Sequence, residues 1–303
     1  MQDDAETRLT EAVIARLSAN ADPRFRRIMH SLIRHLHGFV REVELAEEEW
    51  FEAIKFLTAT GQKCDAKRQE FILLSDVLGV SMLVDAINHR GSDGTTETTV
   101  LGPFFVHGAP EIENGGDMAA GWKGEPTYVS GQVLSTEGGP LAGALLDLWQ
   151  SNSEGWYDVQ LADTGGKRLR ARLRADADGR YRVRTILPTA YPVPTDGPMG
   201  QVLHRMGRHP MRPAHLHFMV SAPGHETVVT HLFVKGDPYL QSDAVFGVKD
   251  ALVVDFRRSE SEDEARNLGL KAPFYSAAYD FVLRPATGAR QRSARSAADT
   301  AMG

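Results

Sequence analysis

Two different periods of apolar residues divide this chain. Between residues 23 and 43, apolar side chains recur every three or four positions, which is the spacing of one face of an α-helix. Pro23 suits the first turn of this helix. The same spacing predicts three further helices: one that ends near Asp22-Pro23, one over Glu47–Thr58 and one from about Lys67 to His89. The sequence Gly91-Ser92-Asp93-Gly94 is typical of a turn and ends the helical part.

After residue 95 the period becomes two, as in β-strands that bury one face. Turn sequences such as Glu137-Gly138-Gly139-Pro140 separate the apolar runs, and no helical patterns alternate with them. The predicted strands are Tyr128–Leu134, Ala144–Trp149, Arg180–Ile186, His215–Val220, Val228–Val234, Ala251–Phe256 and Tyr279–Leu283. Short strands punctuated in this way favour an antiparallel β-sandwich.

The sequence therefore predicts a mixed α and β protein with two domains. We expect a helical domain over residues 1–95 and an antiparallel β-sandwich domain over residues 96–285. Residues 286–303 contain few apolar side chains, so we expect them to form a disordered tail.

Composition removes several classes of function. The chain has 303 residues, 42% of them hydrophobic and 24% charged, which is ordinary for a globular protein with a large core. A net charge of −6 argues against binding to nucleic acid. The single cysteine, Cys64, excludes an intramolecular disulfide and a thiolate-ligated zinc or iron–sulfur site. Because the sequence also lacks a secretion signal and a membrane-spanning apolar run, we expect a cytoplasmic enzyme or binding protein.

His215 and His217 alternate with apolar residues in one predicted strand. Side chains two positions apart point to the same face of a strand, so both imidazoles project together while Leu216, Phe218 and Val220 face the core. Two converging imidazoles are half of a site for a first-row metal. The alternative is that both histidines are partly buried structural residues, and the pair alone does not decide between the two.

Two tyrosines extend this pattern. Tyr157 follows a predicted strand in Trp156-Tyr157-Asp158, and Tyr191 lies in a loop rich in proline and glycine. Two tyrosinates and two neutral imidazoles would stabilise Fe(III), because tyrosinate suits a hard trivalent ion. Fe(II) oxygenases instead use two histidines and a carboxylate, and this chain offers no obvious candidate for that carboxylate. Each tyrosine taken singly is also consistent with a buried aromatic side chain whose hydroxyl is hydrogen-bonded.

Over residues 10–285 the chain resembles the intradiol ring-cleavage dioxygenases, which are non-haem Fe(III) enzymes. The motifs that carry the resemblance are Asp147-Leu148-Trp149-Gln150, Gly155-Trp156-Tyr157-Asp158, Tyr191, Asp196-Gly197-Pro198, Gly207-Arg208-His209, Arg212-Pro213-Ala214-His215-Leu216-His217 and Gly236-Asp237-Pro238-Tyr239. The resemblance implies one Fe(III) ion per subunit, with Tyr157, Tyr191, His215 and His217 as its ligands. It also implies that Arg212 and Tyr191 act in catalysis, with Tyr191 as the ligand that substrate displaces.

The same resemblance implies partners for the protein. Family members are homodimers whose N-terminal helices form the interface, and some hold a phospholipid there. For this chain it implies a dimerisation domain over residues 1–95 and a catalytic domain over residues 96–285. A small aromatic diol or triol and O2 are the expected reactants.

Two segments resemble the branch of the family that cleaves hydroxyquinol, benzene-1,2,4-triol. These are Leu73–Gly79 and Val100–Phe105. Asp76 takes a position where catechol-cleaving members commonly have an apolar residue or proline, and it would accept a hydrogen bond from the third ring hydroxyl. An exposed helix carboxylate is the alternative for Asp76. The expected substrate pocket comprises Leu73, Asp76, Val100, Leu101, Gly102, Pro103, Phe104, Val193, Pro194, Arg212 and Val245.

Three functions remain in competition. The first is intradiol cleavage of hydroxyquinol to 3-hydroxy-cis,cis-muconate (maleylacetate), with catechol or chlorocatechol as alternative substrates. The second is an extradiol or other Fe(II) oxygenase, against which the missing carboxylate counts. The third is a non-catalytic dimeric β-sandwich that binds a ligand. His231, in Thr230-His231-Leu232-Phe233, stands where many catechol enzymes have glutamine, and its role stays open.

Overall fold

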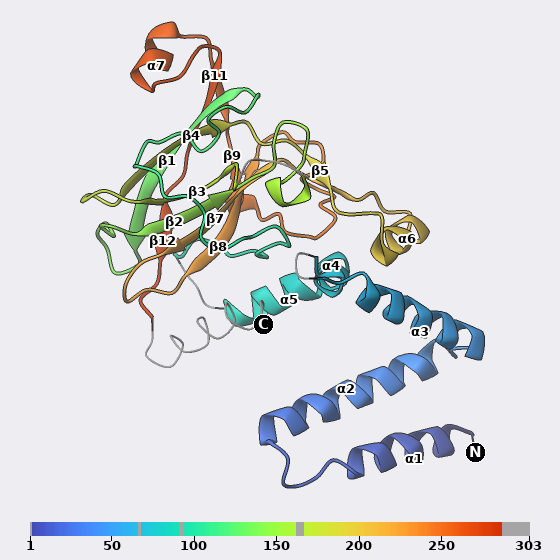
Figure 1. Ribbon diagram of the computed structural model, residues 1–303. Helices are drawn as coiled ribbons and strands as arrows, with labels where there is room; N and C mark the ends of the chain where they lie inside the picture. Colours follow the sequence, from blue (N-terminus) through green and yellow to red (C-terminus); the bar gives the residue numbers. More distant parts are fainter. Residues whose placement is uncertain (1, 66–67, 91–93, 162–166, 287–303) are drawn as a thin grey trace. The chain divides into compact units, whose positions relative to one another are not determined.

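The structure of this protein is a computed structural model in which residues 2–65, 68–90, 94–161 and 167–286 are described (Figure 1). Packing contacts divide the chain into two compact units, residues 1–59 and 60–303, which are treated separately below. Apart from Ala286, the tail predicted to be disordered lies outside the described residues.

The first unit contains the helices α1 (Gln2–Ala15), α2 (Pro23–Glu42) and most of α3 (Glu47–Gln62). Asp22 caps α2 by accepting the N–H of Phe25 at 2.7 Å, and Pro23 occupies the first turn as predicted. Helix α1 ends seven residues before Asp22. One reason is local, because the Ser18 hydroxyl accepts the backbone N–H of Asn20 and so competes with continued helix.

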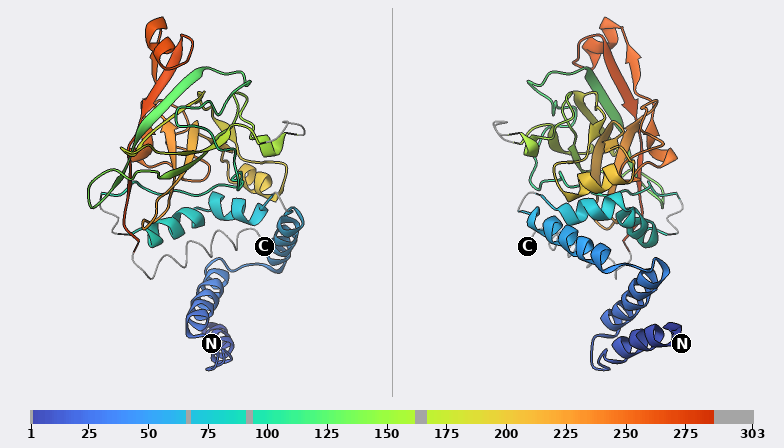
Figure 2. Two further views of the ribbon diagram at one scale, coloured as in Figure 1. Left: turned by 60° about the vertical axis from the view of Figure 1, so that its left-hand side comes forward. Right: turned by 90° about the vertical axis from the view of Figure 1, so that its right-hand side faces the viewer.

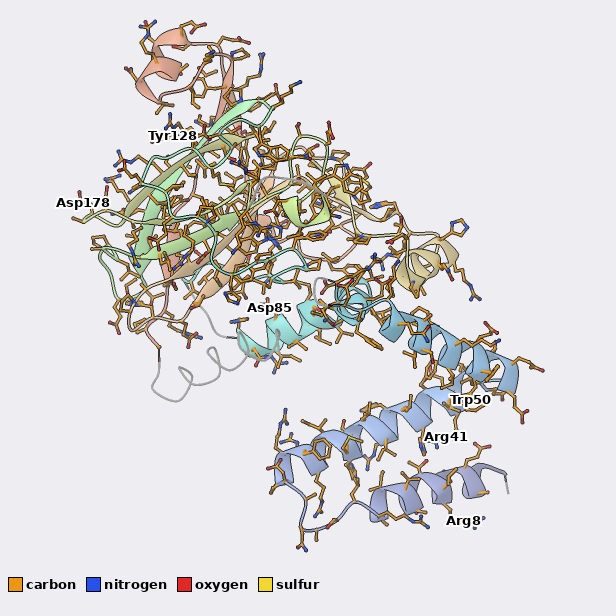
Figure 3. The ribbon with its side chains drawn as sticks, viewed as in Figure 1. Arg8, Arg41, Trp50, Asp85, Tyr128 and Asp178 are labelled. Carbon is orange, nitrogen blue, oxygen red and sulfur yellow. The ribbon has the colours of Figure 1, made fainter. Side chains whose placement is uncertain are left out.

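Helix α2 presents its apolar stripe to solvent. At helical spacing this stripe consists of Phe25, Ile28, Leu32, Leu36, Phe39, Val40 and Val43, all of them exposed. The next helix is similar, with exposed Trp50 (labelled in Figure 3), Phe51, Ile54 and Leu57. A soluble protein rarely leaves so large a continuous apolar surface uncovered.

The second unit begins with α4 (Glu70–Val77) and α5 (Val80–Asn88). The sequence predicted one helix over this segment, which is wrong. The chain breaks at Gly79, whose φ of +72° lies in the left-handed region that ends helices and favours glycine. The periodic apolar residues continue across this break, so the pattern alone concealed it.

Two five-stranded sheets form the body of the second unit. Figures 1 and 2 show how their strands are arranged. One sheet has the order β10-β11-β1-β12 with β4 also paired to β1, and the other has the order β3-β2-β7-β8-β9. The strands are β1 (Pro126–Ser135), β2 (Leu145–Trp149), β3 (Arg170–Arg174), β4 (Arg180–Ile186), β7 (His215–Ser221), β8 (Val228–Val234), β9 (Val253–Val254), β10 (Arg257–Ser259), β11 (Phe274–Ala278) and β12 (Phe281–Leu283).

The core lies between the inner faces of these sheets. Val129 and Tyr181 from one sheet pack in the same buried cluster as Leu148, Phe218 and Leu232 from the other. The predicted sandwich is therefore confirmed. Most neighbouring strands are antiparallel, but β1 runs parallel to β11 and β12, and β8 runs parallel to β9.

Several short elements were not predicted. They are the ribbon of β5 (Tyr191–Pro192) and β6 (Met211–Arg212), the helices α6 (Pro198–Arg205) and α7 (Glu262–Asn267), the 3-10 turns Asp158–Gln160 and Asp250–Leu252, and the strands β3, β10 and β11. Strand β3 was missed because its arginines hide the alternation, although Arg170 itself is buried. Within the described residues, no helix combines the length and apolar character needed to cross a bilayer.

Candidate metal centre

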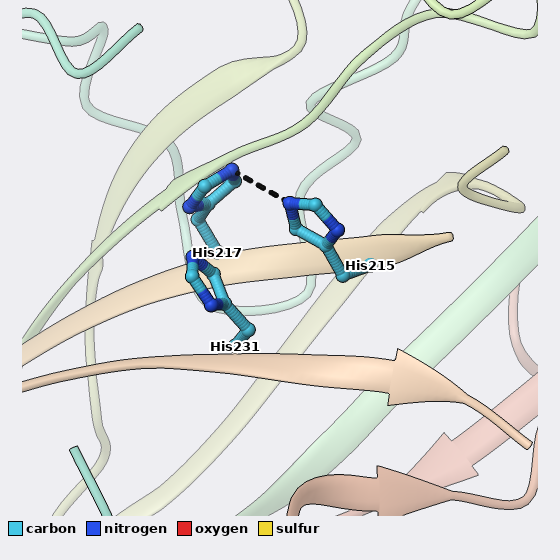
Figure 4. Close-up of side chains that lie close together, drawn as sticks. All are labelled: His215, His217 and His231. Atoms are coloured by element: carbon cyan, nitrogen blue, oxygen red, sulfur yellow. Dashed lines mark hydrogen bonds between the residues drawn. The ribbon is translucent and has the colours of Figure 1, made fainter. Parts of the chain in front are cut away.

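Strand β7 places its two histidines on the face away from the core. His215 and His217 are buried with at most 1% of their surface exposed, while Leu216, Phe218 and Val220 join the core cluster. The predicted alternation is thus confirmed. Across the next strand pair, His217 stands opposite His231 of β8, so three imidazoles gather at one place (Figure 4).

The two tyrosine hydroxyls meet the imidazoles in a closed ring of four atoms, here called the donor ring. Tyr157 Oη lies 2.8 Å from His217 Nε2 and 3.2 Å from Tyr191 Oη. Tyr191 Oη lies 3.3 Å from His215 Nε2, and the two Nε2 atoms are 3.1 Å apart. Four residues from three segments, separated by up to 60 positions, therefore aim one donor atom each at a common point.

Local contacts prepare the imidazoles for a cation. His215 Nδ1 is 2.7 Å from the carbonyl oxygen of Pro213, which only accepts hydrogen bonds, so Nδ1 carries the proton and Nε2 presents a lone pair to the ring. Trp149 stacks on His217 with ring centroids 4.6 Å apart. Gly102 also approaches this ring, since a Cβ there would lie 3.4 Å from His217 Cε1.

Burial sets the protonation states in the ring. It lowers the pKa of His215 to about 3, with Arg212 adding to the effect, and it lowers the pKa of His217 well below the usual value. Burial raises the pKa of Tyr157 well above the usual value, and Tyr191 reinforces this. Burial also raises the pKa of Tyr191, although Arg212 opposes the rise. Without a cation, the ring therefore holds neutral imidazoles and protonated phenols.

This donor set fits a first-row metal ion. Donors bound at about 2.0–2.3 Å to one ion lie roughly 3 Å from their neighbours, which matches the spacings in the ring. A cation would replace the two phenolic protons and take up the lone pairs that otherwise face each other. Among the described residues, His215, His217 and His231 also form a cluster of potential metal-binding side chains.

His231 is buried beside His215 and His217. Its Nδ1 is 2.6 Å from Thr99 Oγ1. Its ring centroid lies 4.3 Å from that of His217 and 4.7 Å from that of His215. Within the described part of the chain, His231 Nε2 has no hydrogen-bond partner. Sequence reasoning left this residue open and missed Thr99, which is 132 positions away.

Arg212 borders the donor ring. Its Nη1 lies 3.3 Å from His215 Nε2 and 3.5 Å from Tyr191 Oη. Burial opposes its charge, yet its pKa is raised, because the Asp243 carboxylate favours the cation. Asp243, which sequence reasoning missed, pairs with Arg212 Nε at 3.1 Å. Nothing local in the sequence marks this aspartate.

A second buried pair supports the tyrosine loop. Arg170 donates to both carboxylate oxygens of Asp158, the residue after Tyr157, and to the carbonyl of Phe104 at 3.2 Å. Phe104 in turn stacks on Tyr157 with ring centroids 4.4 Å apart. Arg170 therefore joins two segments that position one phenol.

The other predicted pocket residues are distributed unevenly. Gly102 lies close enough to His217 that a Cβ there would be 3.4 Å from its Cε1, and Phe104 stacks on Tyr157. Val245 lies in the loop that holds Arg212 through Asp243. Asp76 of α4 is buried, which raises its pKa, while a hydrogen bond from Ser81 and the charge of Arg212 oppose the rise. The exposed carboxylate considered for Asp76 is therefore excluded. Leu73, Val100 and Val193 are also buried, Pro103 and Pro194 are half-buried, and Leu101 is exposed.

Comparison with known proteins places these residues in a family context. Residues 22–96 match the model of the catechol dioxygenase N terminus, and residues 100–285 match the dioxygenase model. Together the two models cover most of the chain.

Three similar proteins span almost its whole length. A 6-chlorohydroxyquinol 1,2-dioxygenase of Cupriavidus pinatubonensis is 52% identical, over 94% of this chain and 99% of its own. The crystal structure of hydroxyquinol 1,2-dioxygenase from Pseudomonas putida DLL-E4 has 52% identity and a TM-score of 0.87, covering 94% of this chain and 100% of its own. That of catechol 1,2-dioxygenase from Pseudomonas arvilla C-1 has 32% identity and a TM-score of 0.80, covering 94% and 93%.

Proposed function

This chain belongs to the intradiol ring-cleavage dioxygenases, and we propose that it cleaves hydroxyquinol with O2 to 3-hydroxy-cis,cis-muconate, the enol form of maleylacetate. The reaction breaks the bond between the two carbons that carry adjacent hydroxyls, and both atoms of O2 enter the product. The observation that carries the chemistry is the closed ring of two phenols and two imidazoles.

The proposed cofactor is one non-haem Fe(III) ion per subunit, held by Tyr157, Tyr191, His215 and His217. Two phenolate charges favour the trivalent over the divalent ion, and the neutral imidazoles complete the set. When bound, the ion would act as a Lewis acid that favours the deprotonated form of the diol, whose ring is more electron-rich than that of the neutral diol.

The protein side chains have distinct tasks in this proposal. Pro213 fixes the tautomer of His215, and Arg170 and Phe104 fix Tyr157. Tyr191 Oη, which also faces Arg212, takes up one proton of the incoming diol. Arg212 stays protonated and places its Nη1 where negative charge develops on the substrate, so its contribution falls on the transition state.

Substrate choice is assigned to Asp76. A buried oxygen acceptor within the electrostatic influence of Arg212 suits a ring that carries a third hydroxyl, and catechol lacks that hydroxyl. The similarity to hydroxyquinol-cleaving relatives, at 52% identity against 32% for a catechol enzyme, supports the same choice. The remaining pocket residues named from the sequence, among them Leu73, Val100 and Val193, would form its apolar walls.

We also propose that the protein is a homodimer. The exposed stripe of α2, from Phe25 to Val43, would lie at the interface, with residues 1–95 as the dimerisation domain and 96–285 as the catalytic domain. A phospholipid at this interface would cover further apolar surface. A cytoplasmic location is part of the same proposal. Sedimentation and extraction of lipid from purified protein test the first two points, and cell fractionation tests the third.

An absorption spectrum of the purified protein tests the proposed site. Tyrosinate bound to Fe(III) gives a broad visible charge-transfer band, so we expect a red protein that contains about one iron per subunit. Anaerobic titration should shift the band at a lower concentration of hydroxyquinol than of catechol. A shift that favours catechol keeps the site and removes the role of Asp76. A protein that stays colourless after addition of iron contradicts the dioxygenase proposal and leaves a binding module.

A further inference from the structure

Two buried arginine–aspartate pairs flank the donor ring, and they differ in what they leave unused. Arg170 directs its guanidinium at Asp158 and at the carbonyl of Phe104. Arg212 donates its Nε–H and Nη2–H to Asp243, and its Nη1 lies against the donor ring. The first pair joins two segments of the protein, whereas the second presents a charged group to the place where substrate binds.

The carboxylate of Asp243 is fully occupied. Oδ1 accepts Arg212 Nε–H at 3.1 Å and the backbone N–H of Val245 at 3.3 Å. Oδ2 accepts Arg212 Nη2–H at 3.3 Å and the backbone N–H of Gly247 at 2.9 Å. A carboxylate offers about four acceptor positions, and here two go to the arginine and two to the loop that carries the aspartate.

The loop after Asp243 is wound around this carboxylate. The backbone N–H of Phe246 is bonded to the Asp243 carbonyl at 3.1 Å, and Phe246 has φ of +59°, a strained conformation for a residue with a bulky side chain. Arg208 supports the same loop by donating to the Ala244 carbonyl at 2.9 Å and by lying over the Phe246 ring. The backbone of this loop therefore fixes the Asp243 carboxylate, and the fixed carboxylate in turn binds Arg212.

We propose that Asp243 is a positioning residue that fixes the plane of the Arg212 guanidinium and aims Nη1 at Tyr191 and His215. A guanidinium held by Nε and Nη2 together has lost its freedom to rotate about the last side-chain bonds, which a single hydrogen bond does not achieve. This inference rests on the role given to Arg212 in the proposed function. It adds a residue that touches neither substrate nor metal and acts only through the arginine.

The first test is a double-mutant cycle with Asp243→Asn and Arg212→Gln. Asparagine replaces one acceptor by an NH2 group that faces donors, so Arg212 is released. We expect kcat of iron-loaded Asp243→Asn to fall about 10²-fold, while the anaerobic Kd for hydroxyquinol changes less than about threefold. The double variant should be no slower than Arg212→Gln alone, because both changes remove one interaction.

The outcomes of this cycle separate the inference from the proposed function. If losses in kcat multiply in the double variant, Asp243 does not act through Arg212 and the inference is wrong. If Arg212→Gln is slow but Asp243→Asn is normal, the inference alone fails. If Arg212→Gln keeps full kcat, the role of Arg212 in the proposed function fails, and the inference fails with it.

A second variant keeps every charge and covers the case in which Asp243→Asn does not fold. Gly247 has no positive φ, so alanine fits its backbone, but the new Cβ would lie 3.0 Å from Arg212 Nη2 and 3.2 Å from Asp243 Oδ2. The pair must then shift by a few tenths of an ångström. We expect Gly247→Ala to lower kcat about three- to tenfold with little change in Kd. An unchanged kcat contradicts the inference.

A readout without iron or turnover completes the design. In metal-free protein labelled with 15N, the Nε–H of Arg212, identified by its loss in Arg212→Gln, should exchange slowly with solvent, and at least tenfold faster in Asp243→Asn. Asp85→Asn is the matched control, because Asp85 is a largely buried carboxylate paired with Lys249 at 3.2 Å and has no bond to Arg212. It should lower stability without changing this exchange rate, and a rate equal in wild type and Asp243→Asn overturns the inference.

Discussion

Polar side chains are usually exposed and apolar side chains buried, and the donor ring and helix α2 each depart from this rule. The donor ring buries polar groups, whereas α2 exposes apolar ones. In the ring, Tyr157, Tyr191, His215 and His217 are polar and at most 2% exposed, whereas on α2 Leu32 and Phe39 are apolar and more than 50% exposed. Both arrangements cost free energy in an isolated chain, because buried donors lack water and exposed apolar surface orders it. In the proposed function, a bound cation would offset the first cost and a partner surface on the helix would offset the second.

The largest expected effect comes from removing one donor of the ring. We expect His215→Ala and Tyr157→Ala to lower the iron content from about one per subunit to nearly none and to abolish the visible band, because three donors hold the ion far more weakly than four. Metal analysis by mass spectrometry measures this directly. His209→Ala is the control, since His209 lies outside the ring and bonds Ser242. An iron-replete and active His215→Ala variant would remove this histidine from the proposed site.

The next effect concerns the other region. We expect Leu32→Asp combined with Leu36→Asp to convert the proposed dimer into monomers at micromolar concentration, because each apolar side chain removed from an interface loses about 1.5–3 kcal/mol and each new carboxylate must be desolvated. Analytical ultracentrifugation gives the mass, and iron content should stay normal. Arg34→Glu changes a charge on the same helix outside the apolar stripe and should remain dimeric. A wild-type monomer, or a dimeric double variant, contradicts the proposed interface.

These two regions also show what the sequence reveals. The helical period of α2 and the alternation in β7 are local, so both elements and the inward face of Leu216, Phe218 and Val220 were predicted correctly. The break at Gly79 was missed because apolar periodicity continues through it, and β3 was missed because arginine replaces apolar residues in a buried strand.

The supporting residues of the site are a harder case. Asp243, Thr99 and Arg170 act through partners 31, 132 and 12 positions away in the sequence. No periodicity or spacing rule identifies such pairs, because the fold alone brings them together. The four donors were recognised by their motifs, whereas these supporting residues were identified only from their contacts in the structure.

A third prediction tests selection of the substrate. We expect Asp76→Ala to lower the ratio of kcat/KM for hydroxyquinol to kcat/KM for catechol about 10- to 100-fold. Only hydroxyquinol has a third hydroxyl that could donate a hydrogen bond to this carboxylate. Asp76→Asn is the matched control, since it keeps the volume and one acceptor oxygen and should retain part of the preference. Equal ratios in wild type and Asp76→Ala show that the third hydroxyl is recognised elsewhere.

A fourth prediction uses the neutral imidazoles of the ring in metal-free protein. Below pH about 6.5 the unfolded chain binds a proton at His215, whereas the folded chain resists protonation there until pH about 3. The free energy of unfolding should therefore fall as pH drops from 7 to 5. His89 opposes this trend, because a hydrogen bond to Asp85 raises its pKa and stabilises its protonated form. The measure is thus the difference in urea unfolding between wild type and His215→Gln, whose pH slope should be smaller. Identical pH slopes in wild type and His215→Gln contradict the lowered pKa of His215 in the folded protein.

The smallest effect is expected at the ion pairs of Asp196. This prediction tests whether burial or charge determines how much a polar group contributes to the free energy of unfolding. Asp196 bonds Lys63 at 3.0 Å and Arg68 at 2.7 Å, and these hydrogen bonds lower its pKa to about 2, yet its side chain is 63% exposed. Its contribution to the free energy of unfolding is present above pH about 4 and is lost as pH falls through about 2. At pH 7, Asp196→Asn should lower the free energy of unfolding by less than about 1 kcal/mol, and less still in 1 M salt.

Glu70 is the buried counterpart of Asp196 on the same arginine. It bonds Arg68 at 2.8 Å and accepts the backbone N–H of Met199 at 3.2 Å, with its side chain fully buried. Glu70→Gln should cost about 3–5 kcal/mol, because Arg68 loses the buried carboxylate that accepts its Nε–H and Nη2–H, and because an acceptor is replaced by a donor beside an N–H group. Urea unfolding of the two variants in parallel measures the difference. Equal losses at Asp196 and Glu70 would show that charge, and not removal from water, sets the energy of polar groups in this unit.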